Sequence, residues 1–111
     1  MNWLKWQPGR QGSGYDKLLI ATARWPVPWD CYLIRYREGS LISYHTDPVD
    51  KKKHFRLNVI VKRAERGGEF YCERAILVSK RIILFRPDIS IHAVAKVIEG
   101  SRYVFSIGWV L

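Results

Sequence analysis

Hydrophobic and polar residues alternate along the chain after residue 30, as they do in half-buried β-strands. The clearest run is Phe55–Lys62, and turn signals such as Glu38-Gly39 and Gly67-Gly68 separate it from its neighbours. Helical periodicity is nearly absent from this part of the chain. The pattern predicts about eight short strands: Cys31–Arg37, Leu41–His45, Phe55–Lys62, Glu69–Cys72, Ala75–Val78, Arg81–Phe85, Ile91–Val97 and Arg102–Val110.

The run around Phe55–Lys62 presents two faces, because every second residue of a strand points the same way. Arg56 and Asn58 lie on the face opposite the apolar stripe, where they either line a functional site or contact solvent. The stripe consists of Phe55, Leu57, Val59 and Val61, and the opposite face of His54, Arg56, Asn58 and Ile60.

About eight short strands within about 80 residues favour a β-sandwich, a barrel or a jelly roll. With 111 residues, 48% of them hydrophobic, the chain is expected to form a single domain with its own core. We divide it into an N-terminal arm, residues 1–30, which packs on the barrel, and core strands in residues 31–111.

The N-terminal arm is rich in aromatic residues and turns. Four of the five tryptophans, Trp3, Trp6, Trp25 and Trp29, lie in it. Large aromatic side chains of this kind mostly serve a core, so we expect the arm to pack them against one face of the domain. The sequence leaves open whether Tyr15–Ala23 forms a short helix within the arm.

The composition argues against a membrane protein. The apolar runs are far shorter than the roughly 18 residues of a membrane span, and Met1–Arg10 has no apolar region of the kind that secretory signals carry. Cys31 and Cys72 are expected to be free thiols in a reducing compartment rather than a disulfide. These observations predict a cytoplasmic protein.

The formal net charge is +9, from 19 Lys and Arg against 10 Asp and Glu. Such a charge keeps a protein in solution, and it also attracts polyanions such as nucleic acid. The basic residues are spread along the chain, with one compact run at Lys51–Lys53. Nucleic acid is therefore one partner that the sequence allows.

Candidate metal ligands begin with His45 and Asp47, which lie at the end of a predicted strand, just before Pro48. Residues two apart in an extended chain point to one side, so an imidazole and a carboxylate can reach one point in space. The two other histidines are His54 and His92. Two His and one carboxylate form the facial triad of non-haem Fe(II) oxygenases, with three coordination positions left open.

Arg102 follows His92 by ten residues, and an arginine facing a barrel interior needs an anionic partner. If Glu99-Gly100 were a two-residue hairpin loop, Arg102 would pair with Val97 and would face away from the side of His92. Two devices repair this parity. One is a bulge at Ala95-Lys96, and the other is a three-residue loop, 98–100, with Gly100 in the left-handed conformation.

A series of short motifs covers about 70% of the chain, from Tyr32 to Leu111. They are Tyr36-Arg37-Glu38-Gly39, Tyr44-His45-Thr46-Asp47, Gly67-Gly68-Glu69-Phe70, His92-Ala93-Val94 and Gly100-Ser101-Arg102 with Trp109. In this order they resemble the 2-oxoglutarate- and Fe(II)-dependent dioxygenase superfamily, in its prolyl-hydroxylase-like branch. The resemblance implies a mainly all-β fold, the double-stranded β-helix, a jelly roll of the cupin-like kind.

The resemblance also implies roles for individual residues. His45, Asp47 and His92 would be the iron ligands, and Arg102 would pair with the distal carboxylate of 2-oxoglutarate. Tyr36 matches a tyrosine that contacts this cosubstrate, and the alternative is that it is a tyrosine of the core. We expect Ser106 and Asn58 to support the same site. The implied activity is a hydroxylase that uses Fe(II), 2-oxoglutarate and O₂, with ascorbate as a reductant.

The chain departs from this family in two ways. It is short, so only residues 1–30 remain to buttress the barrel. The link from Asp47 to Phe55 is also short and leaves little room for a large lid. Both departures suggest an open site, or help from a second subunit in a homodimer. The substrate stays unidentified: a protein, a nucleic acid or a small molecule.

Three alternatives compete with the oxygenase. Another cupin-like metalloenzyme, an isomerase or a zinc hydrolase, would explain the three ligands but not Arg102. A basic β-barrel could bind nucleic acid without catalysis, with Trp3, Trp6 and Tyr15 exposed among the basic residues. A degenerate oxygenase fold could also serve as a binding module, although an intact ligand set argues against it.

Overall fold

The computed structural model describes residues 6–8, 14–49 and 52–111, and within them every regular element is a β-strand. None of the described segments forms a helix of the length and apolarity needed to cross a membrane. The strands are β1 Trp6–Pro8, β2 Tyr15–Ala23, β3 Trp29–Tyr36, β4 Ile42–His45, β5 His54–Lys62, β6 Arg66–Gly67, β7 Phe70–Cys72, β8 Ala75–Val78, β9 Ile82–Phe85, β10 His92–Val94, β11 Val97–Glu99 and β12 Arg102–Val110.

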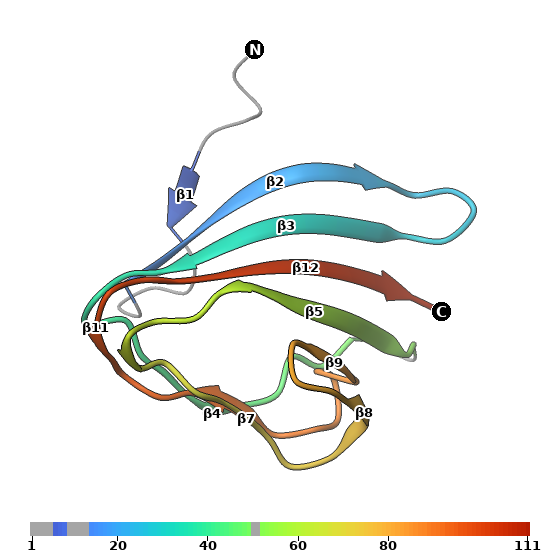
Figure 1. Ribbon diagram of the computed structural model, residues 1–111. Helices are drawn as coiled ribbons and strands as arrows, with labels where there is room; N and C mark the ends of the chain where they lie inside the picture. Colours follow the sequence, from blue (N-terminus) through green and yellow to red (C-terminus); the bar gives the residue numbers. More distant parts are fainter. Residues whose placement is uncertain (1–5, 9–13, 50–51) are drawn as a thin grey trace.

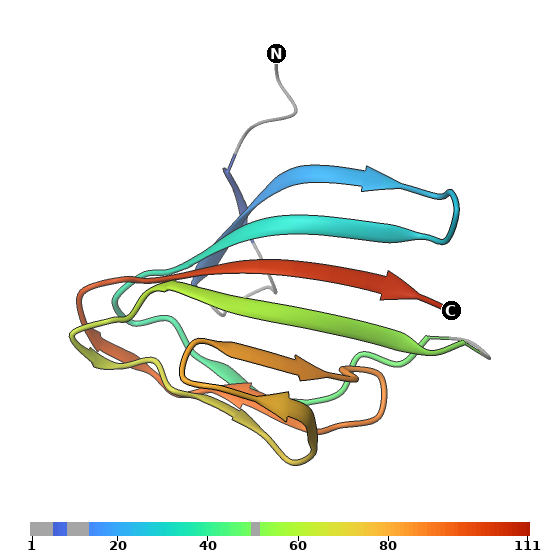
Figure 2. The ribbon, with the colours of Figure 1, turned by 45° about the vertical axis from the view of Figure 1, so that its right-hand side comes forward.

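The strands form one large sheet and one small sheet that face each other, as Figures 1 and 2 show. The large sheet has the order β1-β2-β3-β12-β5-β9-β8, and the small sheet has the order β4-β10-β7. A further two-stranded pair, β11 with β6, lies at one end. This antiparallel, two-layered arrangement is a jelly roll and confirms the expected fold class.

Tyr15–Ala23 is a strand, so a helix in this segment is wrong. The segment pairs antiparallel with β3 from Tyr15 opposite Tyr36 to Ala23 opposite Trp29, with one irregularity between Leu19 and Ala21. Backbone hydrogen bonds to a neighbouring strand therefore outweigh the local preference of Leu and Ala for helix. The arm extends the large sheet, and Trp3 lies outside the described residues.

The predicted strand Ile91–Val97 is divided in two. His92–Val94 pairs with β4 and β7 in the small sheet, whereas Val97–Glu99 pairs with β6. Ala95 lies between them, and its amide donates to the carbonyl of Glu69. The break lets the chain leave the small sheet.

The expected hairpin between the strand of His92 and Arg102 is also wrong. β12 crosses to the large sheet, where Arg102 lies opposite Tyr36 of β3 and Tyr103 lies opposite Lys62 of β5. Gly100 does have a positive φ of 81°, which glycine adopts without strain. His92 and Arg102 therefore belong to different sheets, and neither proposed repair of a hairpin applies.

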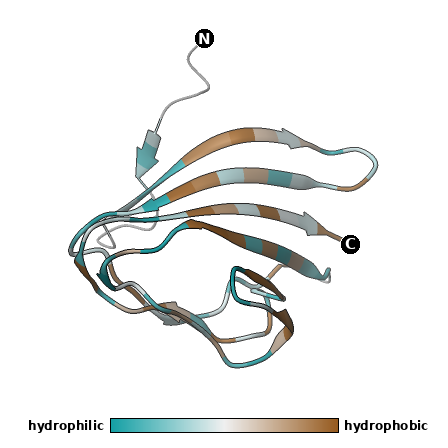
Figure 3. Ribbon diagram, viewed as in Figure 1, coloured by the Kyte–Doolittle hydropathy of each residue, from teal (hydrophilic) through white to brown (hydrophobic). Residues whose placement is uncertain are grey.

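The core fills one end of the space between the sheets. Its buried members come from both layers, and Tyr15, Ile34, Ala64 and Phe70 pack around them: Tyr36, Ile42, Val94, Val97 and Val104. Along β12 every second side chain from Arg102 to Gly108 is buried, and a corresponding alternation of hydropathy is visible along β5 in Figure 3. The inward positions towards the other end carry polar side chains, and these form the site.

Candidate metal centre

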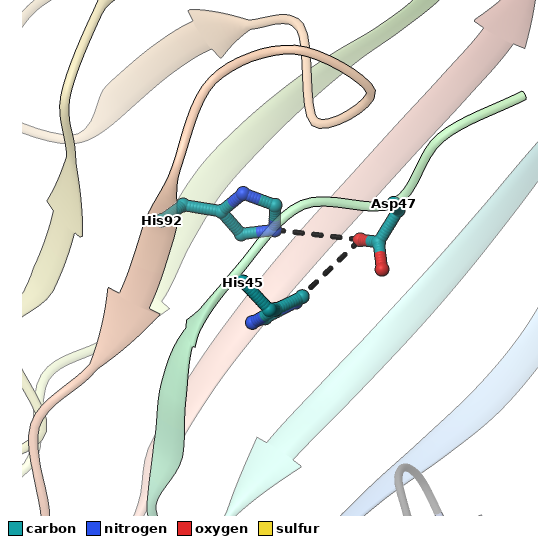
Figure 4. Close-up of side chains that lie close together, drawn as sticks. All are labelled: His45, Asp47 and His92. Carbon is teal, nitrogen blue, oxygen red and sulfur yellow. Dashed lines mark ion pairs between the residues drawn. The ribbon is translucent and has the colours of Figure 1, made fainter.

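Three potential metal ligands converge where the small sheet ends. His45 is the last residue of β4, Asp47 follows it on the connecting segment, and His92 begins β10 (Figure 4). His92 lies directly opposite His45 in the strand pairing, and the Asp47 amide donates to the carbonyl of Pro87 at 2.7 Å. One imidazole nitrogen from each histidine and a carboxylate oxygen all lie within 4.8 Å of one another.

Backbone carbonyls orient both imidazoles. His45 Nδ1 lies 2.7 Å from the carbonyl oxygen of Ser43, and His92 Nδ1 lies 2.9 Å from that of Ser90. Since a carbonyl only accepts hydrogen bonds, each Nδ1 must donate, which leaves the Nε2 lone pair of the neutral ring for another partner. This is the arrangement that histidine ligands of metals adopt.

Ser90 is itself fixed in place. Its hydroxyl accepts a hydrogen bond from the amide of Arg74 and donates one to the carbonyl of the same residue, both at 2.9 Å. The side chain of Phe85 packs its ring edge-on against His92, with centroids 5.2 Å apart. The position of His92 therefore depends on a hydrogen-bonded turn and on a packed aromatic ring.

The donor set fits a metal ion. His45 Nε2 and His92 Nε2 lie 3.6 and 3.4 Å from Asp47 Oδ2, which is too long for good hydrogen bonds. Metal–ligand bonds of about 2.0–2.2 Å place two ligands of one ion about 3–3.5 Å apart. The Asp47 side chain is 43% exposed, against 9% for His92, so the site is open to solvent on the side of the carboxylate.

The triad lines a cavity of about 370 Å³ between the two sheets, the metal cavity. Three of the residues expected to support a cosubstrate, Tyr36, Asn58 and Ser106, line the same cavity. Ser106 is fully buried and its hydroxyl donates to Asn58 Oδ1 at 2.6 Å. The structure thus brings six of the seven expected site residues to one space, and their roles stay predictions.

Tyr36 is a neutral phenol in this cavity. Burial raises the pKa of its hydroxyl, with a further contribution from Tyr15, whose ring centroid lies 5.4 Å from that of Tyr36. A phenol that keeps its proton can donate a hydrogen bond to a bound anion. Because Tyr15 packs here, it is not one of the exposed aromatics that a nucleic-acid-binding surface requires.

Arg102 is the seventh expected site residue, and it lines a different cavity. This second cavity, of about 290 Å³, shares Asn58 and Phe70 with the metal cavity. Arg102 is 8% exposed, and burial lowers the pKa of its guanidinium. Among the described residues its side chain makes no ion pair.

Several residues that line the metal cavity were not expected from the sequence. Lys17 extends from β2, and Asp30 and Tyr32 extend from β3. A signal for two of them existed, because Asp30, Tyr32 and Tyr36 are separated by even numbers of residues and so share one face of their strand. Lys17 could not be found in this way, since its strand was not recognised.

The fold and the site together define a jelly-roll protein in which two histidines and one carboxylate could hold a single metal ion. No protein-family model matches the sequence, and no curated protein matches it in sequence.

The solved structures that share the fold include KdgF and a chain of a sigma-factor complex. KdgF from Halomonas sp., a cupin-fold protein, superimposes with a TM-score of 0.62 at 16% identity, over 95% of this chain and 84% of that one. A chain of the Rhodobacter sphaeroides complex of SigE with the anti-sigma ChrR gives a TM-score of 0.55 at 14% identity. The match covers 95% of this chain but only 48% of that chain. At these identities the likeness establishes the fold alone.

Proposed function

We propose that this protein is a mononuclear metalloenzyme whose metal ion is held by His45, Asp47 and His92. The observation that carries the proposal is the convergence of two Nε2 atoms and a carboxylate at the wall of a cavity. Both Nδ1 atoms are occupied by backbone carbonyls, so the free lone pairs face the carboxylate. Two imidazole nitrogens and one carboxylate oxygen are a donor set that suits a divalent metal ion.

Within this class we propose a 2-oxoglutarate- and Fe(II)-dependent oxygenase that hydroxylates a C–H bond. Two histidines and one carboxylate leave three coordination positions open, enough for a bidentate 2-oxoacid and O₂. When bound, iron would supply the oxidising chemistry, with O₂ as the oxidant and the 2-oxoacid as the co-reductant. Arg102, buried and without an ion pair among the described residues, supports a cosubstrate with a second carboxylate.

The residues of this chain would then bind, orient and exclude water. The backbone carbonyls of Ser43 and Ser90 fix the orientation of the two imidazole rings. Phe70 and Phe85, with ring centroids 5.2 Å apart, form an apolar border beside His92. Tyr36 lines the cavity, and its hydroxyl would donate a hydrogen bond to a bound ligand.

One observation favours a second candidate, another cupin-like metalloenzyme without 2-oxoglutarate. Arg102 lies in the neighbouring cavity, whereas the metal cavity has its own cations, Lys17 and Arg56. An enzyme of this kind would bind its substrate directly against those cations. The fold shared with KdgF is compatible with either chemistry.

The experiment that decides is an anaerobic titration of metal-free protein with Fe(II) and then 2-oxoglutarate. A weak visible charge-transfer band that disappears in His92→Ala supports the oxygenase. Binding of Fe(II) without such a band supports the other metalloenzyme. A protein that binds no metal contradicts both, and a salt-dependent nucleic-acid-binding assay becomes the next measurement.

A further inference from the structure

The metal cavity has a second polar wall, on the sheet that faces the metal ligands. His54, Arg56 and Asn58 alternate along β5 and all line the cavity, together with Lys17 of β2. None of these four side chains belongs to the metal-binding triad.

Arg56 is held in one orientation. Its Nη1 donates to the Ser106 hydroxyl at 2.7 Å, and its Nη2 forms an ion pair with Asp30. Gly108 makes this possible, because a Cβ at that position would lie 2.1 Å from Arg56 Nη2. The guanidinium is therefore fixed before any ligand arrives, with part of its hydrogen-bonding capacity unused.

Lys17 provides a second cation, and no carboxylate of the described residues forms an ion pair with it. Its ammonium lies 5.0 Å from the ring centroid of Tyr32, and among the described residues it forms no ion pair. Among the described residues that line the cavity, the other charged ones are Arg56, Asp30 and Asp47. Two cations thus balance two carboxylates, so a divalent metal ion would leave the cavity with two net positive charges.

His54 adds an unused hydrogen-bonding atom to the same wall. Within the described parts of the chain, its Nδ1 is the only buried side-chain nitrogen or oxygen without a hydrogen-bond partner. A buried polar atom of this kind normally finds a partner in a ligand or an ordered water. Positive charge and an unpartnered nitrogen therefore occur together on one wall.

We propose that this wall binds an oxyanion of the substrate, a carboxylate or a phosphate, with Lys17 and Arg56 as its cationic contacts and His54 Nδ1 as a hydrogen-bond partner. The site would fix the substrate at one end while the reacting end faces the metal ligands. This inference rests on the proposed metalloenzyme, because it assigns a substrate class to the same cavity.

The test is calorimetric titration of sodium phosphate, and separately of sodium acetate, into protein that carries one Mn(II) and is freed of excess metal. We expect millimolar binding of at least one anion, and the tighter of the two identifies the source of the oxyanion. Lys17→Met should weaken this binding about tenfold, and Lys17→Arg should retain most of it. Gly108→Ala, which displaces the Arg56 guanidinium while keeping every charge, should weaken it several-fold.

Lys62→Met is the matched control, because Lys62 is exposed at the far end of β5 and lines neither cavity. It removes the same charge as Lys17→Met and should bind anions like the wild type. Circular dichroism and metal content, measured on every sample, show that each variant is folded and loaded.

Two outcomes would overturn the proposal: a wild type that binds neither anion, or a folded Lys17→Met that binds both as the wild type does. The second outcome would place the anion on the metal or the outer surface. If neither the wild type nor any of the variants binds metal, the proposed function fails. The same titration of metal-free protein then still decides whether the anion site exists.

Discussion

His92 lies directly opposite His45 in the pairing of β10 with β4, and the centroids of the two imidazole rings are 4.3 Å apart. The backbone hydrogen bonds between two paired strands hold opposite residues at a fixed distance from each other. The candidate metal site is therefore built on a sheet, with only Asp47 contributed by a connecting segment. Such a site can stay in place before the metal arrives.

Replacing Asp47 by Ala should weaken Fe(II) binding by more than about a hundredfold and abolish turnover, since the only carboxylate of the ligand set is lost. Binding can be measured anaerobically by competition with a chelator. Glu73→Ala removes an exposed carboxylate elsewhere and should bind Fe(II) normally. Full metal affinity or full activity in Asp47→Ala would show that Asp47 is not a ligand.

Replacing Arg102 by Met should leave Fe(II) binding unchanged and raise the 2-oxoglutarate concentration required by about a hundredfold, because a charge-assisted pair with the cosubstrate is lost while the volume is kept. The anaerobic charge-transfer band gives both quantities in one titration. Arg66→Met is a control, since Arg66 is 67% exposed and pairs with Glu99. An unchanged 2-oxoglutarate requirement in Arg102→Met would favour binding of the anion by the cations of the metal cavity itself.

The sequence was sufficient to predict the features that depend on one strand alone, namely its bounds and the residues that share a face. Ala75–Val78 and Arg102–Val110 have the predicted bounds, and the alternation along β5 places Arg56 and Asn58 on one face, which lines the cavity. The proximity of His45 and Asp47 follows from the same two-residue repeat of an extended chain.

The sequence was insufficient wherever the pairing partner decides. Nothing local to Val97–Glu99 shows that it pairs with β6, or that Arg102 then joins the sheet of Tyr36. Lys17 reaches the cavity through a strand whose leucines and alanines are equally compatible with helix. Pairing is a tertiary property that the local pattern does not encode.

Gly67 should be far less tolerant of substitution than Gly39, although both have a positive φ, of 77° and 86°. Alanine at either position costs about 1–2 kcal/mol for its backbone conformation. A Cβ at Gly67 would also lie 2.1 Å from the carbonyl oxygen of Lys96, whereas nothing lies within 4 Å of one at Gly39. We expect Gly67→Ala to lower the free energy of unfolding by more than about 3 kcal/mol. Equal losses in urea denaturation of the two variants would contradict the close approach of β6 to β11.

The ion pair between Arg86 and Asp88 should make the stability of the fold depend on pH in the acid range. The two side chains approach to 2.5 Å, and Asp88 is 5% exposed. Burial raises the pKa of the Asp88 carboxyl, but hydrogen bonds from Arg86 and from the backbone, including the His54 amide, together lower it below its usual value. Because the folded pKa is lower than the unfolded one, the stabilisation is complete above about pH 4 and is lost as the pH falls through the folded value.

Asp88→Asn should therefore be less stable than the wild type at pH 7, by about 1–3 kcal/mol, and the difference should shrink as the pH falls below about 4. Urea denaturation at a series of pH values gives the free energy of unfolding for each protein. Glu99→Gln is the control, because Glu99 pairs with Arg66 at 3.7 Å on the surface, with both side chains more than half exposed, and such pairs contribute little. The free energy of unfolding of wild type and of Asp88→Asn could instead run parallel down to pH 2. In that case the Asp88 carboxyl is not an ionised hydrogen-bond acceptor that joins the loop before His92 to the start of β5.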